Sequence, residues 1–249
     1  SESMNKNYIA IAADALASDV VNIFEDRDLV SAPVVDKNNI LLGRITIDDV
    51  VDVIREESEH TVLNMAGLTD EEDLFAPILS STRRRAIWLG LNLITALIAS
   101  GVISLFQDTI EKVVALAVLM PIVASMGGIA GSQTLTLVIR GIALGNISSA
   151  NSKSLLIKEV SVGLLNSLLW ASVIGVLSSY WFNNYLIGVV IGVAMIANLA
   201  FAALSGVLIP IVLKKLGVDP ALGGGVILTT ITDVIGFFSF LTLGTIFLL

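Results

Sequence analysis

Residues 221–248 read ALGGGVILTTITDVIGFFSFLTLGTIFL, and Asp233 is the one charged side chain among them. A helix of about 20 mostly apolar residues is long enough to cross the hydrocarbon core of a bilayer. The sequence therefore predicts an α-helical polytopic membrane protein. Four more stretches of this kind lie earlier in the chain, at 86–106, 113–139, 157–182 and 186–213. Together with residues 221–248 they give five predicted spans.

Charge divides the chain into two parts. Only 14% of all residues are charged, whereas a soluble domain has about 25%. Residues 1–85 hold 17 acidic and 8 basic side chains, and residues 86–249 hold 5 acidic and 6 basic ones. We therefore expect an acidic soluble segment ahead of an apolar membrane domain.

Several kinds of chemistry lack the residues that they need. The chain has no cysteine, and His60 is its only histidine, which excludes disulfides, thiolate metal sites, most histidine zinc sites and a Ser-His-Asp triad. It has no P-loop, GxSxG or HExxH motif. We therefore expect a protein that is not an enzyme and has no nucleic-acid partner.

Basic residues between the spans predict the orientation, because cytoplasmic loops are enriched in Lys and Arg. With the N-terminus inside, the outer links carry only Lys112. We therefore predict five spans in the cell membrane with a cytoplasmic N-terminus and an outer C-terminus. The cytoplasmic positions then carry Arg83, Arg84, Arg85, Arg140, Lys153, Lys158, Lys214 and Lys215.

Asp233 is the first candidate for a cation ligand. An acid at the centre of a membrane is costly and usually faces an interior pathway. The alternative is a structural carboxyl that is bonded to a neighbouring helix. Thr229 and Thr230 precede it by about one helical turn and could add an oxygen ligand. Asp219, directly before Pro220, is expected to cap the final helix and is a further candidate ligand.

Glycines mark the second and fifth spans. They predict a broken second span, and two interpretations stay open: close helix packing or backbone carbonyls that face a pore. The candidate pore-lining residues are Gly127, Gly128, Gly131, Gln133, Gly224 and Gly225. Asn166 and Asn198 are expected to be interhelical hydrogen-bond partners. Arg140 and Glu159 are expected to be structural or to extend toward the interface.

The soluble segment predicts a β-α-β-β-α unit in residues 1–58, with strands near 8–11, 32–35 and 41–45. Residues 59–85 would then connect it to a pore domain at 86–249. Two clusters of acids are either solvated helix surfaces or cytosolic sites for hard divalent cations. They are Asp48, Asp49, Asp52, Glu56 and Glu59, and the tetrad Asp70, Glu71, Glu72 and Asp73.

The order of several motifs resembles the MgtE family of magnesium channels and transporters, which is similar to a group of eukaryotic carriers. Residues 33–36 and 42–50 resemble the second repeat of a CBS pair. The segment GGIAGSQ at 127–133 resembles the family's second span, and GVDPA at 217–221 with TITD at 230–233 resembles its fifth. Ile129 and Ser132 stand where the family usually has asparagines, and Gly225 stands where an Asn-Pro pair is common.

The resemblance implies a homodimer whose second and fifth spans line a pore along the two-fold axis. Both copies of Asp233 would then hold one Mg²⁺ or another divalent cation, and cytosolic acids would bind Mg²⁺ and close the gate. Two alternatives stay open: a divalent cation exchanger coupled to Na⁺ or H⁺, and a membrane-anchored sensor that binds an adenine nucleotide at its CBS piece.

Overall fold

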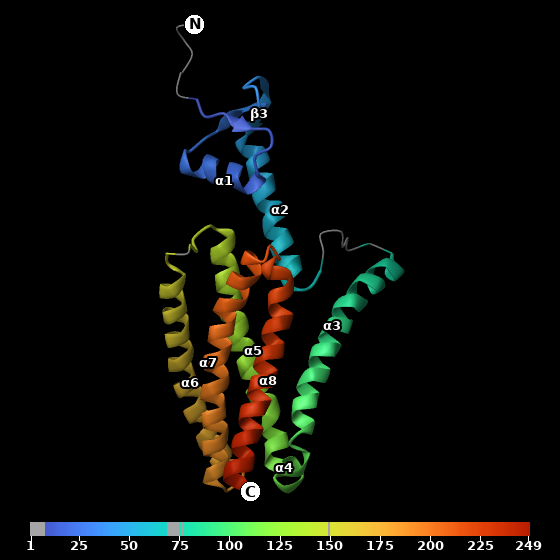
Figure 1. Ribbon diagram of the computed structural model, residues 1–249, viewed down its shortest axis with the longest axis vertical. Coiled ribbons are helices and arrows are strands. Elements are labelled where there is room, and N and C mark those ends of the chain that lie inside the picture. Colours follow the sequence, from blue (N-terminus) through green and yellow to red (C-terminus); the bar gives the residue numbers. More distant parts are fainter. Residues whose placement is uncertain (1–7, 69–74, 76, 149) are drawn as a thin grey trace. The chain divides into compact units, whose positions relative to one another are not determined.

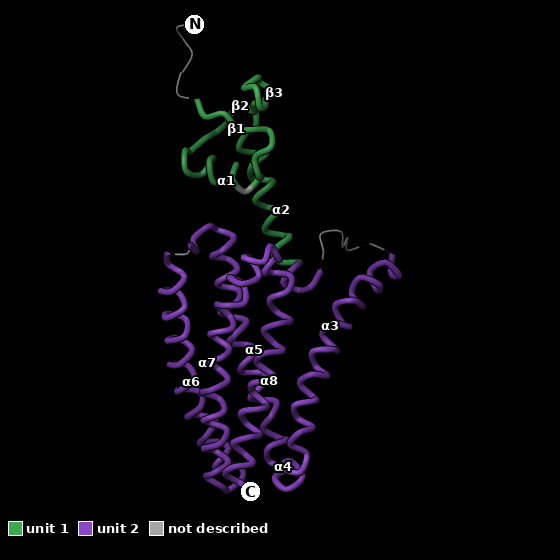
Figure 2. Tube along the Cα trace, in the orientation of Figure 1, with its two compact units in different colours: residues 1–63, 69–71 green, residues 64–68, 72–249 purple. Residues whose placement is uncertain are grey.

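The computed structural model describes residues 8–68, 75, 77–148 and 150–249. The chain divides into two compact units, shown in Figure 2. The first runs to Leu63, and the second holds residues 64–68 and every helix from Ile78 onward. The acidic tetrad at residues 70–73 lies outside the described residues.

The first unit is a small α/β fold in the predicted order. Strand β2 pairs in parallel with β1 and antiparallel with β3, so the sheet order is β1-β2-β3. Its core is built from Ile11, Val20, Phe24, Ala32 and Val50. The elements are β1 (Ile11–Ala12), α1 (Ala17–Asp26), β2 (Ser31–Val35), β3 (Leu41–Thr46) and α2 (Ile47–Met65).

Five helices in the described part of the second unit are long and apolar enough to cross a membrane, which confirms the number of spans. A short helix, α4 (Gln107–Lys112), joins the first of them to the second. The five helices are α3 (Ile78–Ser104), α5 (Val114–Ala143), α6 (Ser152–Trp181), α7 (Tyr185–Lys215) and α8 (Pro220–Leu248).

Helix α7 is the centre of this bundle and packs against α5, α6 and α8. It is also the most buried of the spans, which fits its almost continuous apolar sequence. Helix α3 packs against α8 and has one fully buried residue in its described part, Ala99. In Figure 1, α6 and α3 lie at opposite sides of the other three spans.

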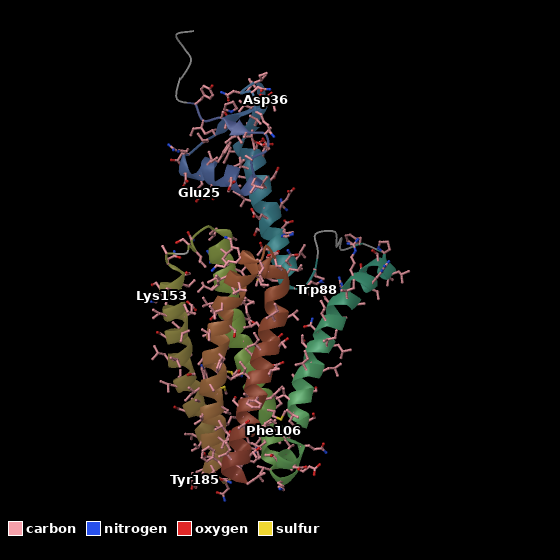
Figure 3. All side chains as sticks on the ribbon, in the orientation of Figure 1. Glu25, Asp36, Trp88, Phe106, Lys153 and Tyr185 are labelled. Atoms are coloured by element: carbon pink, nitrogen blue, oxygen red, sulfur yellow. The ribbon has the colours of Figure 1, made fainter. Side chains whose placement is uncertain are left out.

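Successive spans run in opposite directions. Lys153 at the start of α6 and Tyr185 at the start of α7 lie at opposite ends of the bundle (Figure 3). This alternation places Arg140, Lys153 and Lys214 at one end and Lys112 at the other. The predicted cytoplasmic bases therefore share one end of the bundle.

The expected break in the second span is wrong. Helix α5 is continuous through Gly127, Gly128 and Gly131. Gly127 faces the side chain of Asn198, and Gly131 faces that of Leu228. The absence of a side chain at these two positions lets a neighbouring helix approach closely, while the backbone hydrogen bonds of α5 stay within the helix.

Candidate cation site

Asp233 lies in the middle of α8 and is partly buried. It follows the start of the helix by thirteen residues, a rise of about 20 Å at about 1.5 Å per residue. In the described part of the chain, its carboxylate has no hydrogen-bond or ion-pair partner. An acid in the middle of a span that has no partner in the described part of its chain has the property expected of a site for a cation.

Two threonine hydroxyls precede Asp233 on neighbouring positions of the same helix. Oγ1 of Thr230 donates to the carbonyl oxygen of Val226 at 2.7 Å. Oγ1 of Thr229 lies 3.1 Å from the carbonyl oxygens of both Gly225 and Val226. A hydroxyl that donates its proton to its own helix keeps oxygen lone pairs available, so both threonines can accept a hydrogen bond from the water shell of an ion.

An adjacent side of α8 is used for packing. Six of its buried positions recur every four residues, and Thr232 among them is fully buried. At about 100° per residue, Asp233 points about 100° away from Thr232. The carboxylate therefore lies on the flank of the packed surface rather than in the core. The packed row is Gly224, Leu228, Thr232, Gly236, Phe240 and Gly244.

The structure divides the glycines and the glutamine proposed to line a pore into two groups. Gly127, Gly131 and Gly224 are buried in helix contacts, where an added Cβ would meet Asn198, Leu228 and Leu135, respectively. The other group does not lie in a contact between helices. Gly128 and Gly225 have no atom within 4 Å of an added Cβ, and Gln133 is exposed.

The open side of α5 carries an unusual number of polar groups for a membrane helix. We call Ser125, Gly128, Ser132, Gln133 and Thr136 the polar face of α5. Gly128 is partly exposed and the other four are exposed, and their spacing places all five on one side of the helix. Polar side chains in a span usually face a water-filled path or another helix.

Comparison with known proteins agrees with this arrangement. Residues 120–243, which hold most of α5 and α8, match the MgtE family of divalent cation transporters. Residues 1–56 match a CBS domain. The chain belongs to the MgtE family.

Two curated relatives in this family are named as the magnesium transporter MgtE. The chain is 33% identical to the one from Bacillus subtilis over 240 residues, which cover 96% of this chain and 53% of the relative. It is 32% identical to the one from Thermus thermophilus over 250 residues, covering 99% and 55%, respectively. The chain thus spans about half the length of the curated relatives it matches.

Asp219 lies far from Asp233 and has a different environment in this MgtE-family chain. Its Oδ1 accepts a hydrogen bond from the backbone N–H of Ala221 at 2.9 Å and caps α8, as predicted. Its Oδ2 accepts one from Nδ2 of the buried Asn64 at 2.7 Å. The carboxylate therefore joins the end of α2 to the start of α8.

Glu159 in α6 is a second membrane acid whose partner was not apparent from the sequence. Its side chain is 8% exposed, and Oε1 lies 3.5 Å from Nζ of Lys158. Thr134 of α5 donates to Oε2, also at 3.5 Å. The expectation of a structural residue at this position agrees with these contacts, because Glu159 joins two spans.

The acids of α2 form no compact ligand set in one copy of the chain. No group of three or more Asp, Glu, His or Cys side chains is close enough for a metal ion among the described residues. Glu59 accepts a hydrogen bond from Nε of Arg55 at 3.0 Å. The candidate acids Asp48, Asp49, Asp52, Glu56 and Glu59 are all exposed.

Asp49 caps the start of α2 through hydrogen bonds to Thr46. Its Oδ2 accepts hydrogen bonds from the backbone N–H and the hydroxyl of Thr46, each at 2.9 Å. These two bonds, the backbone one foremost, lower the pKa of Asp49, and Arg44 contributes in the same direction.

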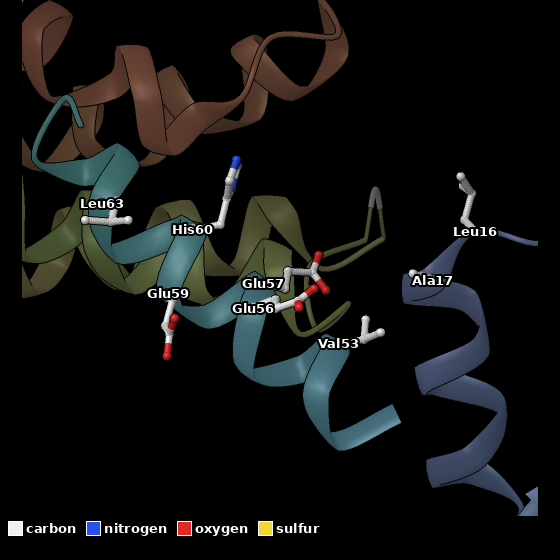
Figure 4. A pocket seen from close by; sticks show the side chains of 8 residues that line it. All are labelled: Leu16, Ala17, Val53, Glu56, Glu57, Glu59, His60 and Leu63. Carbon is white, nitrogen blue, oxygen red and sulfur yellow. The ribbon is translucent and has the colours of Figure 1, made fainter. Parts of the chain in front are cut away.

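A hollow of about 610 Å³ lies beside α2 in the first unit. Figure 4 shows Ala17, the first residue of α1, and Leu16 directly before it on one side. Glu56 and Glu59 of α2 are among its acidic lining residues.

Proposed function

We propose that the chain forms a path for divalent cations, chiefly Mg²⁺, across the cell membrane, with Asp233 as the carboxylate that holds the ion. The observation that carries the proposal is a carboxylate in the middle of α8 that has no hydrogen-bond or ion-pair partner among the described residues. The names of the relatives support Mg²⁺ as the ion.

One Asp233 neutralises half of the charge of a divalent cation, so the proposal includes a homodimer in which two copies share the ion. Mg²⁺ dehydrates reluctantly and usually keeps several of its waters. We therefore expect a largely hydrated ion that the two carboxylates hold through water. The polar face of α5, exposed in a single copy, supplies a second surface that suits such an ion.

The test is Mg²⁺ uptake into liposomes by the variants Asp233→Ala and Asp233→Asn. Both are expected to lose at least about 90% of the uptake, because each leaves the path without its charge. Asp108→Asn is the matched control, since Asp108 is an exposed acid of α4 outside the predicted spans. If Asp233→Ala takes up Mg²⁺ as fast as the wild type, Asp233 is not the carboxylate that holds the ion.

The same liposomes separate a passive path from the exchanger. Uptake through a channel needs no counter-gradient, so we expect equal Mg²⁺ influx with and without a proton or sodium gradient. A strict requirement for either gradient would instead support the coupled carrier on the same scaffold.

We further propose that cytosolic Mg²⁺ binds the acids of α2 and lowers the flux. Two features support this: Asp48, Asp52 and Glu56 are exposed on α2, and α2 ends at the contact between Asn64 and Asp219, which caps the helix that carries Asp233. In the liposome assay, Mg²⁺ on the cytosolic side should slow the flux.

A further inference from the structure

Asn198 of α7 lies at a point where three helices meet. Its side chain is fully buried, and Nδ2 donates to the carbonyl oxygen of Val123 in α5 at 2.8 Å. The sequence predicted such an interhelical hydrogen bond, and the structure confirms it for this residue. Its Oδ1 is buried without a hydrogen-bond partner among the described residues.

Two glycines make room for this amide. A Cβ added to Gly236 of α8 would lie 2.8 Å from Nδ2 of Asn198, and one added to Gly127 of α5 would overlap the same nitrogen. The amide therefore fills a space that these two glycines leave open. As a result, one side chain of α7 contacts both α5 and α8 at the same height.

Asp233 lies close to this contact along α8. Gly236 follows Asp233 by three residues, a rise of about 4.5 Å. On the other side, Leu228 precedes Asp233 by five residues and packs against Gly131 of α5, where an added Cβ would lie 2.9 Å from its side chain. The segment with Asp233 is thus held between two fixed contacts with the rest of the bundle.

We propose that Asn198 is a positioning residue for the cation path: its amide sets the separation of α5 and α8 at the height of Asp233, and thereby the ion selectivity. This inference rests on the function proposed above. Asn198 touches neither the ion nor Asp233 in this account. A polar contact suits the task better than an apolar one, because a hydrogen bond in an apolar surrounding requires one relative position of the two helices.

The test compares Asn198→Leu, which keeps the branching and the number of heavy atoms of Asn but is larger and has no amide, with the wild type in Mg²⁺ and Ca²⁺ uptake into liposomes. We expect the ratio of the two uptake rates to change by about threefold or more, the factor that corresponds to about 0.6 kcal/mol. The half-saturating Mg²⁺ concentration should change as well. Asn166→Leu is the matched control, since Asn166 is an exposed amide of α6.

The outcomes separate this inference from a packing role and from the proposed function. A folded Asn198→Leu protein whose ratio and half-saturation equal those of the wild type would overturn the positioning role, and so would a lower maximal rate alone. Absence of cation uptake by the wild type would remove the proposed function and this inference with it.

A second variant covers the case in which Asn198→Leu does not fold. Gly236→Ala alone should destabilise the protein, because its Cβ meets the amide, and Asn198→Ala should relieve that clash in the double variant. The double variant is then expected to fold and to show the changed ratio. An unchanged ratio in the folded double variant would also overturn the inference.

Discussion

Asp219, which caps α8, and Asp233 within it differ in what their oxygens contact. Both oxygens of Asp219 accept hydrogen bonds, one within the first turn of the helix and one from Asn64. Asp233 has no such partner in the described part of its own chain. A carboxylate whose acceptor sites are already used contributes to structure, and one whose sites are free is available to an ion, so the two residues have separate roles in our proposal.

The cap at Asp49 gives a prediction for the pH dependence of the first unit. Because the pKa of Asp49 is lowered in the folded state, its stabilising effect is complete above the ordinary aspartate pKa of about 3.9 and is lost as the pH falls through the lower folded value. Protease resistance of the first unit in the whole protein should therefore fall more steeply below about pH 4 in the wild type than in Asp49→Asn.

Asp36→Asn is a useful control for this experiment. Asp36 also accepts backbone hydrogen bonds, but it does so in the turn between β2 and β3. Parallel pH profiles for the wild type and Asp49→Asn, with a difference confined to Asp36→Asn, would contradict the role of the helix cap.

At the scale of helices, the contact between α6 and α7 depends on two glycines near the end of the bundle that holds Tyr185. A Cβ on Gly188 would overlap the carbonyl oxygen of Gly175 and the hydroxyl of Ser179. We predict that Gly188→Ala lowers the free energy of unfolding by about 1–3 kcal/mol or more, the usual cost of overpacking. The measurement is thermal or denaturant unfolding in detergent.

Gly90→Ala in α3 is the matched control, because no atom lies within 4 Å of its added Cβ. Alanine also has the higher helix propensity, so this variant should unfold at the wild-type temperature or above it. Equal unfolding temperatures for Gly188→Ala and the wild type would mean that the two helices can separate there at no cost.

The ends of a span could be predicted closely where the apolar run and the helix end at the same residues. The sequence predicts the last span at 221–248, and α8 runs over Pro220–Leu248. It predicts that the first span begins at residue 86, whereas α3 begins at Ile78. Hydropathy reports the part of a helix that suits the membrane. Helix α3 continues into Arg83–Arg85, whose charges hydropathy excludes although arginine is a good helix former.

The candidate site could be predicted only in part. Asp233 stands out because one charge interrupts an apolar run, and the capping role of Asp219 follows from the proline after it. The reason for a glycine at position 127 could not be predicted, because the side chain that occupies the place of its missing Cβ belongs to Asn198, far along the chain. The same holds for Glu159, whose contact with Thr134 depends on how α6 and α5 are packed.

At the scale of the whole molecule, a single copy leaves the polar face of α5 exposed. The proposed homodimer would place the two copies of this face near each other around the ion path. Since the chain has no cysteine, Ser132→Cys provides one thiol per copy. We predict that mild oxidation or a short bifunctional thiol reagent joins two such copies in the membrane.

Ser161→Cys provides the comparison, because Ser161 is an exposed serine of α6. It should give little cross-linked dimer under the same conditions. Efficient cross-linking at Ser161 together with none at Ser132 would mean that the copies meet through α6, and the proposed path between them would then be wrong.

The shared carboxylate of Asp219 also has a thermodynamic consequence. Displacement of Asn64 removes a hydrogen bond to a charged acceptor, a difference of about 1.5–3 kcal/mol. That energy is the upper limit of the coupling free energy between α2 and α8 through the Asn64–Asp219 contact. A ligand that moves the last turn of α2 could therefore change the equilibrium constant between two positions of α8 by about tenfold to a hundredfold. By reciprocity, an ion that prefers one position of α8 would change the affinity of that ligand by the same factor.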